Sequence, residues 1–119
     1  MSSSAVGLLI LRLGLAAVFL WFGFSQLFDG LAWVGWVPAW AVAVIHLPPA
    51  MIVLANGLVE VVLGTLLATG LLVRIVATLL ALHLAVITFD IGLTAIGVRD
   101  FGLTLATIAL ALIEKGDEM

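Results

Sequence analysis

Four long apolar runs, separated by short polar breaks, fill nearly all of this chain. About 20 apolar residues in a helix span the hydrocarbon core of a bilayer. Because 66% of the 119 residues are hydrophobic and 9% are charged, a soluble domain of this length could not bury the apolar surface. The runs predict one all-α domain over residues 1–119, a four-helix antiparallel transmembrane bundle with spans at about 5–28, 51–73, 75–97 and 99–115.

The segment between the first two runs is rich in tryptophan. Trp33, Trp36 and Trp40 follow an i, i+3, i+7 spacing, so their indoles share one side of a short helix. Indoles favour the membrane interface, where both the ring and the N–H group are accommodated. We expect an interfacial segment lying flat at one membrane surface and ending at His46 and Pro48. The alternative is a lid over a ligand.

Glu60 places a carboxylate in the middle of the second run. At about 1.5 Å of rise per residue it lies near the centre of the hydrocarbon core. A carboxylate at this depth is usually paired, protonated or directed into a wet cavity. Asn56, Glu60 and Gly64 are four residues apart, so they share one helix face and leave a shallow groove beside the carboxylate.

The other runs supply partners for this carboxylate. Arg12 and His83 lie at similar depths, so we predict an Arg12–Glu60 ion pair with His83 adjacent. A second polar layer toward the other surface comprises Gln26, Asn56, Asp90, Arg99 and Asp100. The predicted ligand-binding residues are Arg12, Glu60, His83, Asn56, Gln26 and Asp90.

Two simpler interpretations of these residues stay open. The Arg12–Glu60 pair could hold two helices in register without any chemistry. His83 could be a hydrogen-bonded core histidine rather than a ligand or a proton carrier.

Several classes of site are excluded or unsupported. The chain has no cysteine, which excludes disulfides, thiolate-held iron–sulfur clusters and covalently bound c-type haem. His46 and His83 lie near opposite surfaces, so they cannot share one haem iron. No cluster of histidine and carboxylate has the spacing of a metal site, and we expect no metal. There is also no basic patch to bind nucleic acid.

Charge placement predicts the orientation in the membrane. The first run contains Arg12 and follows no basic leader, so we expect a retained helix rather than a signal peptide. Four spans put both termini on the side that carries Arg12, Arg74 and Lys115, against Arg99 on the other. The positive-inside rule then predicts a multi-pass protein of the cytoplasmic (inner) membrane with cytoplasmic termini.

A series of short motifs runs through the chain in a characteristic order. They are Leu11-Arg12-Leu13, Phe19-Leu20, Gly23 to Phe28, Glu60 with Gly64, Gly70 to Arg74, and Arg99-Asp100-Phe101-Gly102-Leu103. Together they cover most of the chain and resemble the DoxX family of small four-helix membrane proteins. Where that family commonly has a lysine after the glycine of the first helix, this chain has Gln26. The change removes a cation from any anion site there.

The resemblance implies a membrane subunit of, or an accessory to, a respiratory or redox-stress oxidoreductase system such as thiosulfate:quinone oxidoreductase. In that role the polar pocket binds a quinone noncovalently, and electrons come from a redox partner subunit; a homo-oligomer in the lipid bilayer is also expected. One alternative is a small proton-coupled multidrug-type exporter, although such exporters carry their essential Glu in the first helix, where this chain has Arg12. The other is a non-catalytic membrane scaffold for a partner protein. Whether the protein is an enzyme is left open.

Overall fold

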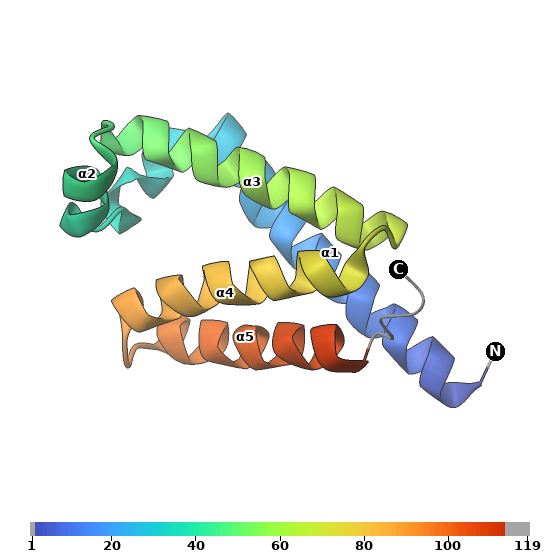
Figure 1. Cartoon of the computed structure of the whole chain (residues 1–119). Coiled ribbons are helices and arrows are strands. Elements are labelled where there is room, and N and C mark those ends of the chain that lie inside the picture. The colour runs from blue at the N-terminus through green and yellow to red at the C-terminus, as the bar shows by residue number, and fades with distance from the viewer. Residues whose placement is uncertain (1, 114–119) are drawn as a thin grey trace.

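The computed structural model describes residues 2–113, which are helical with short connections (Figure 1). The elements are α1 (Ser3–Phe28), the 3₁₀ helix η1 (Gly30–Trp36), α2 (Ala39–Ile45), α3 (Pro49–Thr69), α4 (Val73–Ile91) and α5 (Ala95–Ile113). The helices α1, α3, α4 and α5 are long and apolar enough to cross a membrane. The predicted all-α architecture with four spans is therefore confirmed.

The break between the last two spans lies earlier than predicted. α4 ends at Ile91, followed by Gly92 with φ of 75°, and the Thr94 hydroxyl accepts a hydrogen bond from the Gly97 N–H at 3.0 Å as α5 begins. The predicted spans of 75–97 and 99–115 are wrong at this junction. Arg99 therefore lies inside a helix, and α5 is about 28 Å long at helical rise, enough to span. Residues 114 and 115 lie outside the described residues.

The second span also ends earlier than predicted, at Thr69 instead of residue 73. Gly70 adopts a left-handed conformation with φ of 83°, which glycine accommodates without strain. The Gly70 N–H donates to the Leu67 carbonyl at 3.3 Å, and the Leu71 N–H donates to the Leu66 carbonyl at 3.1 Å. This Schellman motif stops α3 and turns the chain directly into α4.

The spanning helices pack as two pairs, α1 with α3 and α4 with α5 (Figure 1). Glycines bring the first pair together. A Cβ atom on Gly57 would lie 2.9 Å from the Gly23 carbonyl oxygen, and one on Gly23 would lie 2.9 Å from the Val61 nitrogen. The backbones of α1 and α3 therefore touch, as is common where small residues meet at a helix interface in a membrane.

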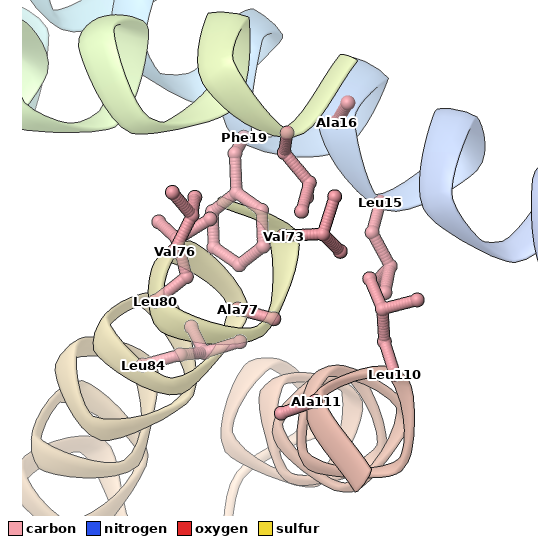
Figure 2. Close-up of a cluster of buried hydrophobic side chains, with 11 residues drawn as sticks. Leu15, Ala16, Phe19, Val73, Val76, Ala77, Leu80, Leu84, Leu110 and Ala111 are labelled. Carbon is pink, nitrogen blue, oxygen red and sulfur yellow. The ribbon is translucent and has the colours of Figure 1, made fainter. Parts of the chain in front are cut away.

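The two pairs meet at one end of the molecule in an apolar core (Figure 2). The cluster contains Phe19 of α1, which points toward Val76 of α4, and Leu15 of α1, which points toward Leu110 of α5. Away from this core the pairs diverge, and η1 and α2 lie toward the open end (Figure 1).

The tryptophan-rich segment is not one helix. η1 ends at Trp36, Val37 and Pro38 are extended, and α2 then begins at Ala39. Pro38 lacks an N–H group and favours this extended backbone, which is why the predicted helical alignment of the three indoles is interrupted.

Candidate functional site

The diverging helix pairs enclose a cavity of about 630 Å³, to which every described helix contributes. This volume lies within the range of natural small-molecule sites, about 300–1,000 Å³. Most of its wall is aliphatic or aromatic, and its aromatic residues are Phe19, Trp21, Phe22, Trp33, Trp36 and Trp40. The cavity can therefore hold a largely apolar ligand.

A hydrogen-bonded network on α1 and α3 forms one polar part of the wall. The Asn56 Nδ2 group donates to Gln26 Oε1 at 2.6 Å and to Glu60 Oε1 at 2.7 Å, and Gln26 Nε2 donates to Glu60 Oε1 at 3.3 Å. The prediction assigned Gln26 and Asn56 to a separate outer layer. That separation is wrong, because Asn56 lies one turn from Glu60 on α3 and the contact between Gly23 and Gly57 brings Gln26 of α1 to the same carboxylate.

Glu60 is 5% exposed and has one oxygen, Oε1, that accepts both amide hydrogen bonds. His83 Nε2 lies 3.5 Å from the same oxygen, close enough for an ion pair but without hydrogen-bond geometry. This nitrogen is a buried polar side-chain atom without a hydrogen-bond partner, and no other was found in residues 2–113. The predicted proximity of His83 and Glu60 is confirmed.

Arg12 lies elsewhere, which corrects the predicted ion pair with Glu60. Its Nη1 donates to the carbonyls of Leu67 at 2.7 Å and Ala68 at 2.9 Å. Leu67 is about 10 Å beyond Glu60 along the helix axis. The last carbonyls of a helix have no donor within the helix, and lipid offers none. Arg12 satisfies these groups at the end of α3 and does not line the cavity.

Two further contacts cross the cavity, one between α2 and the second pair and one between the two pairs. The Trp40 Nε1 group of α2 donates to Asp90 Oδ1 of α4 at 3.1 Å. The Arg99 guanidinium of α5 lies over the Phe22 ring of α1, 5.5 Å from its centroid, and forms an ion pair with Asp100 at 3.1 Å. All five side chains line the cavity. The predicted outer layer is thus divided between two helix pairs.

The tryptophan-rich segment forms part of this wall. Trp33, Trp36 and Trp40 line the cavity, and Trp33 Nε1 donates to Ser25 Oγ at 2.9 Å. This placement is what the lid interpretation expects, and it is compatible with an interfacial position for the same indoles.

Five of the six predicted ligand-binding residues line one cavity, although their binding of a ligand stays a prediction. They are Glu60, His83, Asn56, Gln26 and Asp90. The prediction omitted Arg99 from the ligand-binding residues because it placed that residue at the outer end of the fourth span. Gly92 as a helix stop and Thr94 as an N-cap were the signals that put Arg99 inside the fourth span. Among residues 2–113, no three His, Cys, Asp or Glu side chains come together as metal ligands.

The four spanning helices and their shared cavity define a small multi-pass membrane protein. The DoxX family model matches residues 7–93, and the chain belongs to the DoxX family. The Arg99-Asp100 motif lies beyond the matched region. Comparisons with curated proteins and with solved structures gave no match.

Proposed function

We propose that the cavity binds a neutral, lipid-soluble ligand with acceptor oxygens, most simply a quinone, and that the protein serves a membrane oxidoreductase system. One observation carries the proposal: a largely apolar cavity of about 630 Å³ has His83, Asn56, Gln26 and Glu60 grouped on its wall. A quinone ring combines an apolar body with carbonyl acceptors, which suits a few donors in an aromatic wall.

His83 and Glu60 have complementary roles in this proposal. A protonated His83 pairs with Glu60 through Nε2 and retains Nδ1–H as a donor to a ligand carbonyl. The amides of Gln26 and Asn56 hold Glu60 Oε1 in place. Reduction of a quinone to a quinol takes two electrons and two protons. In this proposal a redox partner subunit supplies the two electrons, and Glu60 and His83 pass the two protons from water to the quinone oxygens.

Ligand-induced thermal stabilisation tests this function. A short-chain benzoquinone should raise the melting temperature of the detergent-solubilised protein, because it binds the folded state. The rise should be lost in His83→Leu. The matched control is His46→Asn, since His46 lies outside the cavity and asparagine tolerates its φ of 62°. Equal stabilisation of both variants would contradict a role for His83, and no stabilisation of the parent would contradict quinone binding.

A second function, binding of hydrophobic cations by a proton-coupled exporter, gains support from the position of Arg12. With Arg12 at the end of α3, no guanidinium within residues 2–113 forms an ion pair with Glu60, and aromatic rings line the cavity. Aromatic faces and a carboxylate both attract organic cations. Stabilisation by tetraphenylphosphonium, lost in Glu60→Gln, together with no response to quinones, would favour this function.

We also propose that the termini are cytoplasmic and that the protein lies in the cytoplasmic membrane. The support is the distribution of Arg12, Arg74 and Lys115 against Arg99. A cysteine at Ser3 should resist a membrane-impermeant thiol reagent in intact cells, while one at Gly30 should react. The native chain has no cysteine to interfere. Labelling at Ser3 with protection at Gly30 would reverse the orientation.

A further inference from the structure

Arg99 offers the cavity donors that no hydrogen bond within residues 2–113 uses. Its Nε and Nη2 groups donate to a single oxygen, Asp100 Oδ1, at 3.2 and 3.1 Å. Its side chain is 52% exposed and lines the cavity. A guanidinium carries five N–H donors, so these two bonds leave Nη1 and one hydrogen of Nη2 available.

The position of the guanidinium is defined by two neighbours. Asp100, whose side chain is 7% exposed, holds one edge of the group. The Phe22 ring lies under the guanidinium, with Cζ 5.5 Å from the ring centroid. These contacts hold one edge and one side of the group, and no hydrogen bond within the described residues uses Nη1. A polar donor in a mostly apolar wall gains most from an acceptor that displaces water.

The charges of the cavity indicate what kind of acceptor this is. The Arg99–Asp100 pair is neutral as a unit, and so is Glu60 when it pairs with a protonated His83 as proposed above. Asp90 adds a further carboxylate to the wall, so the cavity as a whole has no excess positive charge. An anionic ligand would meet these carboxylates. A neutral carbonyl oxygen accepts from Arg99 without that repulsion.

We infer that Arg99 is a ligand-binding and specificity-determining residue, with its free guanidinium edge donating to a carbonyl oxygen of a neutral ligand whose other acceptor oxygen lies at His83. This inference rests on the proposed function and deepens it. Phe22 and Asp100, which also line the cavity, act as positioning residues because they hold the guanidinium.

The test compares two ligands of similar shape, 2-methyl-1,4-naphthoquinone with two carbonyls and 1-tetralone with one. Dissociation constants are measured for the solubilised full chain by quenching of tryptophan fluorescence. The parent should prefer the naphthoquinone by about tenfold, the size of one hydrogen bond from a charged donor. Arg99→Met should lose most of this preference, because one carbonyl no longer has a donor.

Three further variants make the result specific to the guanidinium edge. Arg99→Met leaves buried Asp100 without its cation, so Arg99→Met/Asp100→Asn repeats the measurement with both charges removed. Arg99→Lys keeps the charge but not the planar edge, and it should recover part of the preference. Arg74→Met is the matched control, since Arg74 is exposed outside the cavity and should leave the preference unchanged.

The outcomes separate this inference from the function on which it rests. If the parent binds the naphthoquinone and Arg99→Met keeps the tenfold preference, the role of Arg99 is wrong while quinone binding stands. If the parent binds neither compound, both are wrong. Loss of preference in Arg99→Met and in the double variant, but not in Arg74→Met, supports the inference.

Discussion

The two helix pairs are held together by different means. The α1 and α3 backbones touch at Gly23 and Gly57, and polar side chains bond beside that contact. The α4–α5 pair depends on apolar side chains such as Leu80 and Leu110, both fully buried. The first interface has no room for an added methyl group, and the second cannot lose one without leaving a void. The pairs should therefore respond to opposite kinds of substitution.

Their polar groups differ in the same way. On α5 the hydroxyls of Thr104 and Thr107 donate to carbonyls of their own helix, Asp100 at 2.8 Å and Leu103 at 2.7 Å. On α1 and α3 the amides bond between helices and to Glu60. The first pair thus carries an interhelical network of amides and a carboxylate to the cavity. In the second pair the shorter threonine bonds stay within α5, and one longer contact of 3.4 Å joins the hydroxyls of Thr88 and Thr104 between the helices.

The largest effect should come from adding a methyl group to the first interface. Gly57→Ala would place a Cβ 2.9 Å from the Gly23 oxygen and 2.9 Å from Gln26 Cβ. We expect a loss of about 3 kcal/mol in stability, outweighing the gain in helix propensity of about 1 kcal/mol. Gly14→Ala is the matched control in open space. Equal melting temperatures for these two variants would show that α1 and α3 are not in contact.

Removing volume from the second interface should have the next largest effect. Leu110→Ala leaves a void, and we expect it to lower the stability by about 2 kcal/mol. The cost comes mainly from lost van der Waals contacts, because a side chain that moves between lipid and a protein core gains little hydrophobic free energy. Leu105→Ala, at an exposed position of the same helix, should be close to neutral. The melting temperatures of Leu110→Ala and Leu105→Ala in detergent measure the two effects. Similar losses in the two variants would mean that Leu110 is not packed in the core.

A smaller effect is expected from Arg12, which bonds the end of α3, and from Glu60, in the middle of the same helix. Arg12→Met removes two hydrogen bonds and should cost about 1–2 kcal/mol. Glu60→Gln keeps an acceptor oxygen and should cost less. Because Arg12 and Glu60 share no partner, the double variant should equal the sum to within about 0.5 kcal/mol. If the double variant were more stable than the sum of the single losses predicts, the Arg12–Glu60 ion pair would be supported against the structure.

The smallest effect concerns the link between α2 and the second pair. Trp40→Phe keeps a ring but removes the N–H that donates to Asp90, so we expect a loss below about 1 kcal/mol. Amide hydrogen exchange in α2 should nevertheless accelerate, because this bond anchors the helix to α4. Trp36→Phe, on the preceding 3₁₀ helix, serves as control. Unchanged exchange in Trp40→Phe would mean that other contacts hold α2.

Most of the fold could be predicted from the sequence because hydrophobic length depends on the chain alone. The depth of Glu60 follows from counting residues along the second span, and this residue is buried in the structure. The family resemblance was likewise recognisable from ordered motifs, and the match over residues 7–93 confirms it.

The partners of the charged residues could not be predicted in the same way. Arg12 bonds main-chain carbonyls, which every residue has and no sequence pattern marks. Gln26 meets Glu60 because two glycines set how far α1 slides along α3, and counting depth within each helix does not give that shift. Pairing by depth alone therefore chose Arg12 for Glu60 when the neighbouring amides were closer.

The divergence of the helix pairs has a mechanical consequence in a bilayer (Figure 1). A body whose halves meet at one end and separate toward the other occupies more area in one leaflet than in the opposite leaflet. A ligand that pushes the halves further apart works against the lateral pressure of that leaflet alone. Its affinity should therefore change with the shape of the surrounding lipids, and bilayers of equal thickness but different spontaneous curvature should shift it.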